Sequence, residues 1–233
     1  MTMDKKWESR EYQGYLSEFL SLKCAGDVWN VVNPLGTKAQ KEITESMAMI
    51  HVLRSIVLRR PMELHLIDMC AGNALTSVLA AHLLPIALAT AVDKRERKRR
   101  WDAVKRFRYI VRDIKEFEHV DYRDNTGKYN PHSIIVMAVH PCKTAPDIVK
   151  YFIQSEAAEY LLMMPCCRGG VDRFVKRFTT LELEKFGRYE QWCLYLAELC
   201  RESKGVKVQV YRDKKCISPC NIMIVAEKEV RDE

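Results

Sequence analysis

The sequence predicts an α/β protein built on a seven-stranded, mostly parallel, doubly wound sheet that ends in an antiparallel C-terminal hairpin. Three observations support this prediction. From Leu64 onward, short apolar runs alternate with amphipathic helical segments, as in strand–helix–strand units. Several runs are apolar at nearly every position, as strands covered by helices on both faces should be. The last two runs are separated only by DKKCISP, which is too short for a helical crossover and therefore indicates an antiparallel pair.

Seven apolar runs and five helical segments give the expected order of elements. The expected strands are LHLID (64–68), ALATAVD (87–93), RYIVRDI (108–114), SIIVMAVH (133–140), EYLLMMP (159–165), KVQVYR (207–212) and CNIMIVAE (220–227). The expected helices lie at 75–83, 95–107, 146–154, 171–178 and 182–203, where apolar residues recur at helical spacing.

The N-terminal part is expected to be a helical extension over residues 1–36, followed by one domain over residues 37–233. The extension is rich in aromatic residues and predicts one or two short helices that end near the turn NPLG. Thr37 is the expected N-cap of the next helix. That helix has apolar residues at helical spacing, namely Ile43, Met47, Ile50, Leu53 and Val57.

Composition excludes several classes of protein. The opening MTMDKKWESREY is charged and lacks the apolar core of a secretory signal. The longest apolar stretch, residues 77–92, is interrupted by His82 and Pro85 and is shorter than the ~20 residues that a membrane span needs. Nine cysteines without a signal sequence indicate a reducing compartment rather than a disulfide framework. We therefore expect a cytoplasmic protein without a membrane partner. The sequence does not determine its oligomeric state.

The stretch HLIDMCAGNALTS, residues 65–77, joins the end of a strand to a turn and the start of a helix. Asp68 lies at the carboxyl end of the strand, Gly72 lies in the turn, and the helix begins near Leu75. Ligands of open α/β sheets bind at these carboxyl ends. A glycine there allows a close approach to the backbone, and the helix start offers N–H groups to a carboxylate or phosphate.

Two more aspartates end the next two strands. Asp93 ends the second strand, where a carboxylate can bind both hydroxyls of a ribose, and Asp113 closes the third, near the place of an adenine amino group. Each aspartate alone could simply cap a helix. Three in order indicate a nucleotide cofactor site. The candidate cofactor-binding residues are Asp68, Cys70, Ala71, Gly72, Asn73, Asp93, Lys94, Asp113 and Ile114.

Two cofactors compete for this turn. The dinucleotide pattern G-x-G-x-x-G would fall on Cys70, Gly72 and Leu75, and a leucine fits badly where the helix must pack tightly under a pyrophosphate. The pattern D-x-G-x-G-x-G instead meets only small residues after the acid, at Asp68, Cys70, Gly72 and Ala74. From about residue 38 to the C-terminus, the sequence resembles class I S-adenosylmethionine-dependent methyltransferases. The resemblance implies a Rossmann-like fold and S-adenosylmethionine as cofactor.

A narrower resemblance comes from the ends of the fourth and fifth strands. His140 and Cys142 form a His-x-Cys after the fourth strand, and Cys166 and Cys167 follow the fifth. These motifs, with Lys38 ahead of Glu42 in the preceding helix, resemble the branch of tRNA acceptor-stem 2′-O-methyltransferases and their methyltransferase-like relatives. The zinc-binding extensions of the tRNA enzymes are absent from the sequence. The resemblance implies an RNA substrate, with tRNA 2′-O-methylation as the leading function.

Two other functions stay open at this stage: methylation of a protein or small molecule, and a non-catalytic scaffold that binds the cofactor for a partner. The excess of lysine plus arginine, 38 against 31 acidic residues, is densest in KRERKRR (94–100), which could attract phosphates or be a solvated helix face. The candidate substrate-binding residues are Lys38, Lys143, Arg168, Arg97, Arg99 and Arg100.

His140 is the candidate catalytic residue. Among the side chains expected near the transferred methyl group, only histidine titrates near neutral pH unaided, so it can take the proton of a hydroxyl or amine. The alternative is a histidine that shapes the loop. Cys142, Cys166 and Cys167 could approach His140 and bind zinc. We expect no metal, because adjacent cysteines rarely chelate one ion well and buried cysteines commonly act as small apolar groups.

Overall fold

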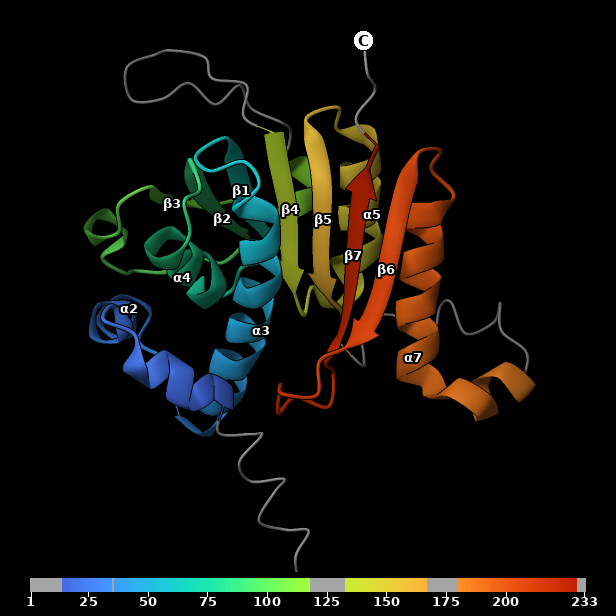
Figure 1. Cartoon of the computed structure of the whole chain (residues 1–233), viewed down its shortest axis with the longest axis horizontal. Coiled ribbons are helices and arrows are strands. Elements are labelled where there is room, and N and C mark those ends of the chain that lie inside the picture. The colour runs from blue at the N-terminus through green and yellow to red at the C-terminus, as the bar shows by residue number, and fades with distance from the viewer. Residues whose placement is uncertain (1–13, 35, 118–132, 167–179, 230–233) are drawn as a thin grey trace, which may run out of the picture.

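The computed structural model describes residues 14–34, 36–117, 133–166 and 180–229, in which one twisted sheet has helices on both faces (Figure 1). The strands are β1 (Leu64–Met69), β2 (Leu88–Asp93), β3 (Phe107–Val111), β4 (Ser133–Val139), β5 (Ala158–Met164), β6 (Val206–Arg212) and β7 (Ile222–Lys228). Their order in the sheet is β3-β2-β1-β4-β5-β7-β6, and only β7 is antiparallel to its neighbours, β5 and β6. The predicted seven-stranded sheet with its C-terminal hairpin is confirmed.

Two layers of helices bury the two faces of the sheet. The helices are α2 (Ala25–Val32), α3 (Ala39–Val57), α4 (Leu75–Leu83), α5 (Ala145–Gln154) and α7 (Thr180–Arg201). Helices α2, α3 and α4 pack in one apolar core on one face, and α5 and α7 pack in a second core on the other. Successive residues of β1 divide between these cores, since Leu66 belongs to the first and Ile67 to the second. This division explains why the strand is apolar at nearly every position.

Helix α3 carries the apolar positions that its spacing predicts. Ile43, Met47, Ile50, Leu53 and Val57 are all at most 3% exposed and lie in the first core. The N-cap residue of α3 is Lys38 rather than the predicted Thr37. The reason is a short 3-10 turn, η1 (Gly36–Lys38), which starts at a left-handed Gly36 and winds the chain before the α-helix begins.

The predicted helix at 95–107 is wrong. This segment contains only a 3-10 turn, η2 (Trp101–Ala103), and β3 begins at its end. Like charges four residues apart, as in Lys94 with Lys98 and Arg95 with Arg99, disfavour a helix here. The guanidinium of Arg106 also donates to the carbonyl oxygens of Ala81 and Ile86, both at 2.7 Å, and so fixes the end of the segment. The predicted helix at 171–178 lies outside the described residues.

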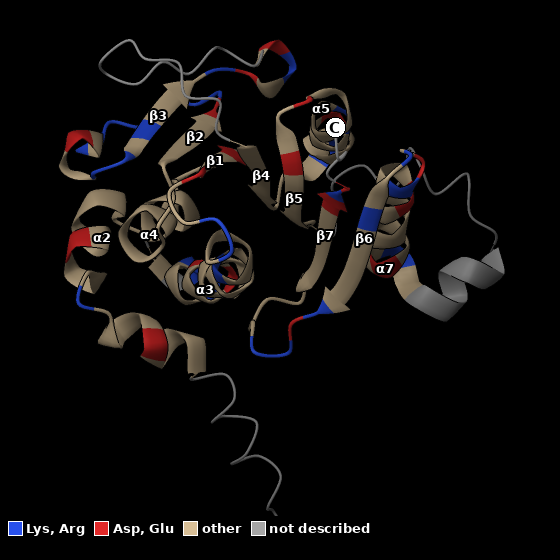
Figure 2. Ribbon diagram, turned by 45° about the horizontal axis from the view of Figure 1, so that its top comes forward, with Lys and Arg blue, Asp and Glu red and all other residues tan. Residues whose placement is uncertain are grey.

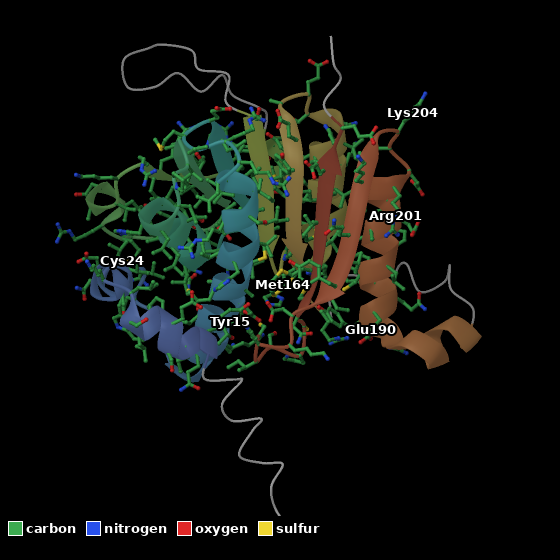
Figure 3. All side chains as sticks on the ribbon, viewed as in Figure 1. Tyr15, Cys24, Met164, Glu190, Arg201 and Lys204 are labelled. Atoms are coloured by element: carbon green, nitrogen blue, oxygen red, sulfur yellow. The ribbon has the colours of Figure 1, made fainter. Side chains whose placement is uncertain are left out.

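The N-terminal helical residues 14–21 contact the loop between β6 and β7. Tyr15 is 5% exposed, and its hydroxyl donates to the carboxylate of Asp213 at 2.7 Å, in the turn after β6 (Figure 3). Tyr15 and Phe19 belong to the same apolar core as α2, α3 and α4. Among the described residues, no helix is long and apolar enough to cross a bilayer.

The strand order reverses direction at β1. From β1 the chain adds β2 and β3 on one side, and it then returns to place β4 and β5 on the other. The carboxyl ends of these parallel strands lie along one edge of the sheet, at the end where α3 begins (Figure 1). Such a reversal leaves a crevice between the loops that follow the two central strands.

Candidate cofactor and active site

A cavity of about 450 Å³ lies at this edge of the sheet. Its wall combines the start of α3, the turn after β1, the segment after β2 and the loop after β4. Eight of the predicted site residues line it: Lys38, Asp68, Cys70, Ala71, Gly72, Asn73, Arg97 and His140. A second cavity, of about 520 Å³, lies between α3 and strands β5, β6 and β7. None of the predicted site residues lines that second cavity.

The turn after β1 has a left-handed backbone at every second residue. The φ angles are 62° at Cys70, 58° at Gly72 and 60° at Ala74. These are the three positions that carry glycine in the D-x-G-x-G-x-G pattern. A non-glycine residue in this conformation costs about 1–2 kcal/mol, so the turn keeps the glycine geometry at the expense of stability. Backbone bonds support it, from Ala71 N to Val92 O (3.1 Å) and from Ala74 N to Ala71 O (2.8 Å).

Asp68 presents an unsatisfied oxygen to the cavity. Its side chain is buried, and Oδ2 accepts a hydrogen bond from the Ser77 hydroxyl. Oδ1 is also buried and has no hydrogen-bond partner among the described residues. Burial raises the pKa of Asp68 to about 7; the Ser77 hydrogen bond opposes this rise and the charge of Asp93 adds to it. A ligand with a cationic or hydroxyl donor would satisfy Oδ1 and favour the ionised form.

Asp93 joins the turn after β1 to the segment after β2. Its carboxylate accepts from the Gly72 N–H at 2.9 Å, and from the Arg95 N–H and Nε at 2.9 and 3.1 Å. Burial would raise the pKa of Asp93, but these hydrogen bonds and the charge of Arg95 outweigh burial and hold it below its ordinary value. Asp93 is therefore ionised at neutral pH, at the position predicted for a ribose ligand.

A pair of aromatic residues supports the same junction. The Tyr109 hydroxyl lies 3.1 Å from the carbonyl oxygen of Gly72 and 2.9 Å from that of Arg95. Its ring stacks on Trp101 with the centroids 4.9 Å apart and the planes 2° from parallel. The Trp101 Nε1–H donates to the Arg97 carbonyl at 3.1 Å. Neither residue is among the predicted site residues. Tyr109 has the pattern of an ordinary strand residue, and Trp101 lies in the segment predicted to be a helix.

Helix α3 contributes two glutamates to the cavity wall. Glu42 accepts from the Asn73 amide at 2.8 Å, which couples α3 to the turn after β1. Glu45 is 3% exposed and lies 2.5 Å from His140 Nε2. Glu45 is not predicted as a site residue. The structure buries it with its polar neighbours Thr44 and Ser46, which the sequence alone does not reveal.

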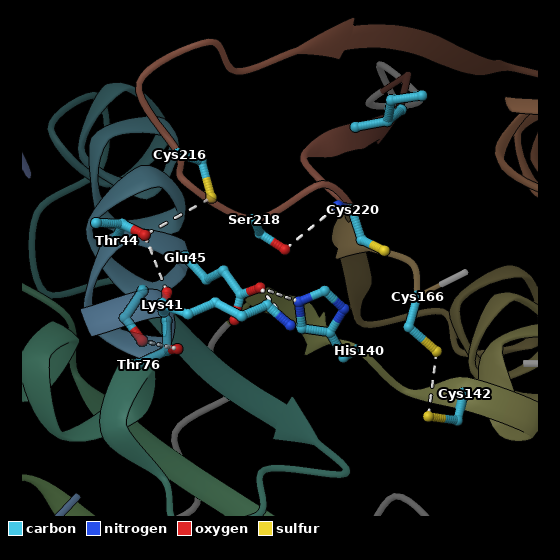
Figure 4. Close-up of polar contacts among 12 residues, drawn as sticks. Lys41, Thr44, Glu45, Thr76, His140, Cys142, Cys166, Cys216, Ser218 and Cys220 are labelled. Carbon is cyan, nitrogen blue, oxygen red and sulfur yellow. Dashed lines mark hydrogen bonds and ion pairs between the residues drawn. The ribbon is translucent and has the colours of Figure 1, made fainter. Parts of the chain in front are cut away.

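His140 follows β4 in a left-handed conformation, with φ of 52°. Its N–H donates to the Met164 carbonyl at 2.8 Å, which ties the loop to the end of β5. The sulfur atoms of Cys142 and Cys166 are 3.1 Å apart beside it (Figure 4). Among the residues that the structure describes, no group of three or more His, Cys, Asp or Glu side chains could hold a metal ion. Cys167 lies outside that part of the chain.

The other predicted residues do not line the cavity. Asp113 accepts from the Lys115 N–H at 3.1 Å and caps the short turn η3 (Ile114–Glu116), while the Ile114 side chain packs against the second core. Arg168 lies outside the described residues. Asp93, Lys94, Arg99, Arg100 and Lys143 are not part of the cavity wall either, although Asp93 is hydrogen-bonded to Gly72 and Arg95 of that wall.

Comparison with known proteins gives the family. The profile of a family described as "Methyltransferase domain" matches residues 38–173, which is more than half of the chain. The chain belongs to this methyltransferase family. The match confirms the predicted enzyme class, an S-adenosylmethionine-dependent methyltransferase.

Individual relatives are distant. A curated mouse (Mus musculus) glutathione S-transferase C-terminal domain-containing protein is 25% identical over 160 residues, which are 65% of this chain and only 23% of that protein. The plantazolicin methyltransferase BpumL, solved with SAH and a monoazolic desmethylPZN analog, has 13% identity, a TM-score of 0.51 and coverage of 97% of both chains. Its complex with a pentazolic analog and SAH has 11% identity, a TM-score of 0.50 and coverage of 98% of this chain and 100% of that chain. These structures share the fold.

The cavity fits S-adenosylmethionine, the cofactor predicted for this family and fold. The unsatisfied Asp68 Oδ1 is an acceptor for an ammonium group, and the ionised Asp93 carboxylate is an acceptor for hydroxyls. Lys38 and Arg97, which are predicted to bind substrate, lie in the same wall.

The raised pKa of Asp68 predicts a specific pH dependence of stability. Between the ordinary pKa of 3.8 and about 7, the folded protein keeps a proton that the unfolded chain has lost. The stability of the wild type should therefore fall as pH rises through this window, and that of Asp68→Asn should not. Without cofactor, the stability of the wild type should fall from pH 5 to pH 8 by roughly 2–3 kcal/mol more than that of Asp68→Asn.

Denaturant unfolding of both proteins at the two pH values measures this difference. Asp102→Asn, in the exposed turn η2, is the matched control and should show no such change. An equal difference between Asp68→Asn and the wild type at pH 5 and pH 8 would contradict a raised pKa at this site.

Proposed function

We propose that this protein methylates RNA, with a tRNA ribose 2′-hydroxyl as the leading acceptor. The proposal rests on one observation: the turn after β1, with its buried carboxylate, and His140 after β4 line the same cavity. A group that can hold the cofactor and a group that can take a proton are thus close together. The short motifs at His140–Cys142 and Cys166–Cys167 add the resemblance to tRNA enzymes.

The residues at the ends of β1 and β2 would hold the cofactor. Asp68 would accept from its ammonium group, and Asp93 from its ribose hydroxyls, while the backbone of Cys70–Gly72 would lie against it. In this role Arg95 must share Asp93 with the ribose, which the 61% exposure of its side chain permits. Asp113, which follows β3 outside the cavity wall, would lie near the adenine amino group, with Lys94 and Ile114 as further cofactor contacts.

When bound, S-adenosylmethionine supplies a methyl group made electrophilic by the sulfonium. The protein has two remaining tasks, which are to position the acceptor in line with that methyl group and to remove the acceptor's proton. His140 would take the proton, because the residue lines the cavity and its Nδ1 atom makes no hydrogen bond within the described part of the chain.

Cationic side chains at the cavity favour a phosphate-bearing acceptor. Lys38, Lys41, Arg95 and Arg97 line the wall, and Arg99 and Arg100 follow in the same segment. Lysine and arginine there can neutralise backbone phosphates and supply the non-specific part of RNA affinity. Figure 2 shows that basic segments (blue) and acidic segments (red) alternate around the sheet. The RNA-binding surface would therefore be the cations at the cavity rather than one wholly basic face of the protein.

Methyl transfer from radiolabelled S-adenosylmethionine to total RNA tests the proposed acceptor. We expect label in RNA that ribonuclease treatment removes, and a nuclease digest should place it on a 2′-O-methylated nucleoside. Label that survives ribonuclease and is lost with protease would indicate a protein acceptor. Cofactor binding with no transfer to RNA, protein or small molecules would favour the scaffold function and overturn the proposal.

Removing the Asp93 carboxylate should weaken cofactor binding. A hydrogen bond to a charged group contributes about 1.5–3 kcal/mol, so Asp93→Ala should raise the dissociation constant for S-adenosylmethionine roughly ten- to a hundredfold. Isothermal calorimetry measures this change. Asp102→Ala removes an exposed aspartate outside the cavity wall and should bind like the wild type. Unchanged affinity in a folded Asp93→Ala protein would be evidence against the assignment.

Removing the imidazole should stop turnover without loss of the cofactor. General-base removal typically lowers the rate on the order of 10²–10⁴-fold, so His140→Asn should lose turnover and keep its affinity for S-adenosylmethionine. Single-turnover assays and calorimetry on the same preparation separate the two effects. If His140→Asn methylates RNA at nearly the wild-type rate, the histidine shapes the loop and the base is another residue.

A further inference from the structure

We infer that Glu45 is a positioning residue that fixes the tautomer of His140 and makes Nδ1 the atom that takes the acceptor's proton. The inference rests on the proposed role of His140 and adds a second residue to it. Glu45 comes from the middle of α3 and His140 from the loop after β4, so the two meet only in the folded protein (Figure 4). No sequence motif joins them.

The contacts of Glu45 hold its carboxylate ready for this role. It lies 2.5 Å from His140 Nε2 and has Lys41 Nζ 3.4 Å away. Glu45 is 3% exposed and His140 is 20% exposed, so water screens the pair weakly. Burial would raise the pKa of Glu45, but the hydrogen bond and charge of His140, with Ser218 and Lys41, outweigh it and lower the pKa. The carboxylate is thus ionised at neutral pH.

An ionised carboxylate can only accept hydrogen bonds. The proton of the neutral imidazole must therefore sit on Nε2, which leaves the lone pair on Nδ1. Nδ1 is buried and has no hydrogen-bond partner among the described residues. The backbone holds the ring in place, since His140 N–H is bonded to the Met164 carbonyl at the end of β5. Proton removal requires a base that is oriented in advance and whose acceptor atom is not already engaged in a hydrogen bond.

Glu45 is the charged group in direct contact with the imidazole. The cavity wall around the pair also carries the cations Lys38, Lys41, Arg95 and Arg97, the acids Glu42 and Asp68, and the thiols of Cys70, Cys166 and Cys220. Among these cations, Lys41 contacts Glu45 itself, with Nζ 3.4 Å from the carboxylate. The Glu45 carboxylate therefore stabilises the imidazolium that forms at His140.

Methyl transfer requires only the cofactor, the acceptor and His140 as base. The acceptor oxygen or nitrogen forms a bond to the methyl carbon as the carbon–sulfur bond breaks and its electron pair passes to sulfur. The acceptor's proton moves to His140 Nδ1, and Glu45 stays ionised throughout. His140 then releases the proton to solvent.

Two-bond ¹H–¹⁵N spectra of the imidazole test the tautomer without any substrate. In the wild type at alkaline pH, we expect protonated Nε2 and bare Nδ1 at His140, and in Glu45→Gln a mixture of tautomers. The control is Glu18→Gln, which changes a similar pair, because His51 Nε2 lies 2.9 Å from Glu18 Oε2 outside the site cavity. That variant should leave the His140 signals unchanged. A proton on Nδ1 in the wild type would overturn the inference, whatever the variants do.

Kinetics then separate positioning from mere support of the fold. Glu45→Gln should lower kcat about 10- to 100-fold, the equivalent of one hydrogen bond to a charged group, with little change in KM for S-adenosylmethionine. Unchanged kcat, or a loss through KM alone, contradicts positioning. If His140→Asn keeps full turnover, the proposed base fails, and the spectra still decide what Glu45 does to the ring.

Discussion

The hydrogen bond from Gly72 N–H to the Asp93 carboxylate is the contact on which the site depends. It joins the turn after β1 to the end of β2, across two strands that are already paired in the sheet. Without a carboxylate at position 93, the Gly72 N–H and the Arg95 guanidinium would lose their shared acceptor. The same residue thus supports the turn geometry and places an ionised carboxylate in direct contact with Gly72 and Arg95 of the cavity wall.

That coupling explains how the turn works with one glycine in place of three. Cys70 and Ala74 take up left-handed conformations that normally favour glycine. Hydrogen bonds from both sides of the turn offset the free-energy cost of these conformations. Asn73 is bonded to Glu42 of α3, and Gly72 is bonded to Asp93 and Tyr109. Strain of this kind persists where surrounding structure over-determines the backbone, and it gathers at functional sites.

The strands and the cofactor turn could be predicted because their signals are local. Runs such as SIIVMAVH are apolar at nearly every position because both faces of β4 are covered, and Asp68 and Gly72 keep a recognisable spacing. The segment after β2 could not be predicted, because its basic residues individually favour helix while their mutual repulsion and the Arg106 contacts with α4 do not. Glu45 could not be assigned a role because its partner His140 is 95 residues away and comes close only through the fold.

The central claim is that S-adenosylmethionine chemistry takes place in the cavity at the carboxyl ends of β1, β2 and β4. A crystal structure of the protein with S-adenosylhomocysteine tests it most directly. We expect the ligand in this cavity, with its ammonium group at Asp68, its ribose at Asp93 and its sulfur facing His140. A ligand bound instead between α3 and strands β5, β6 and β7, or a ligand here without contact to Asp68 and Asp93, would contradict it.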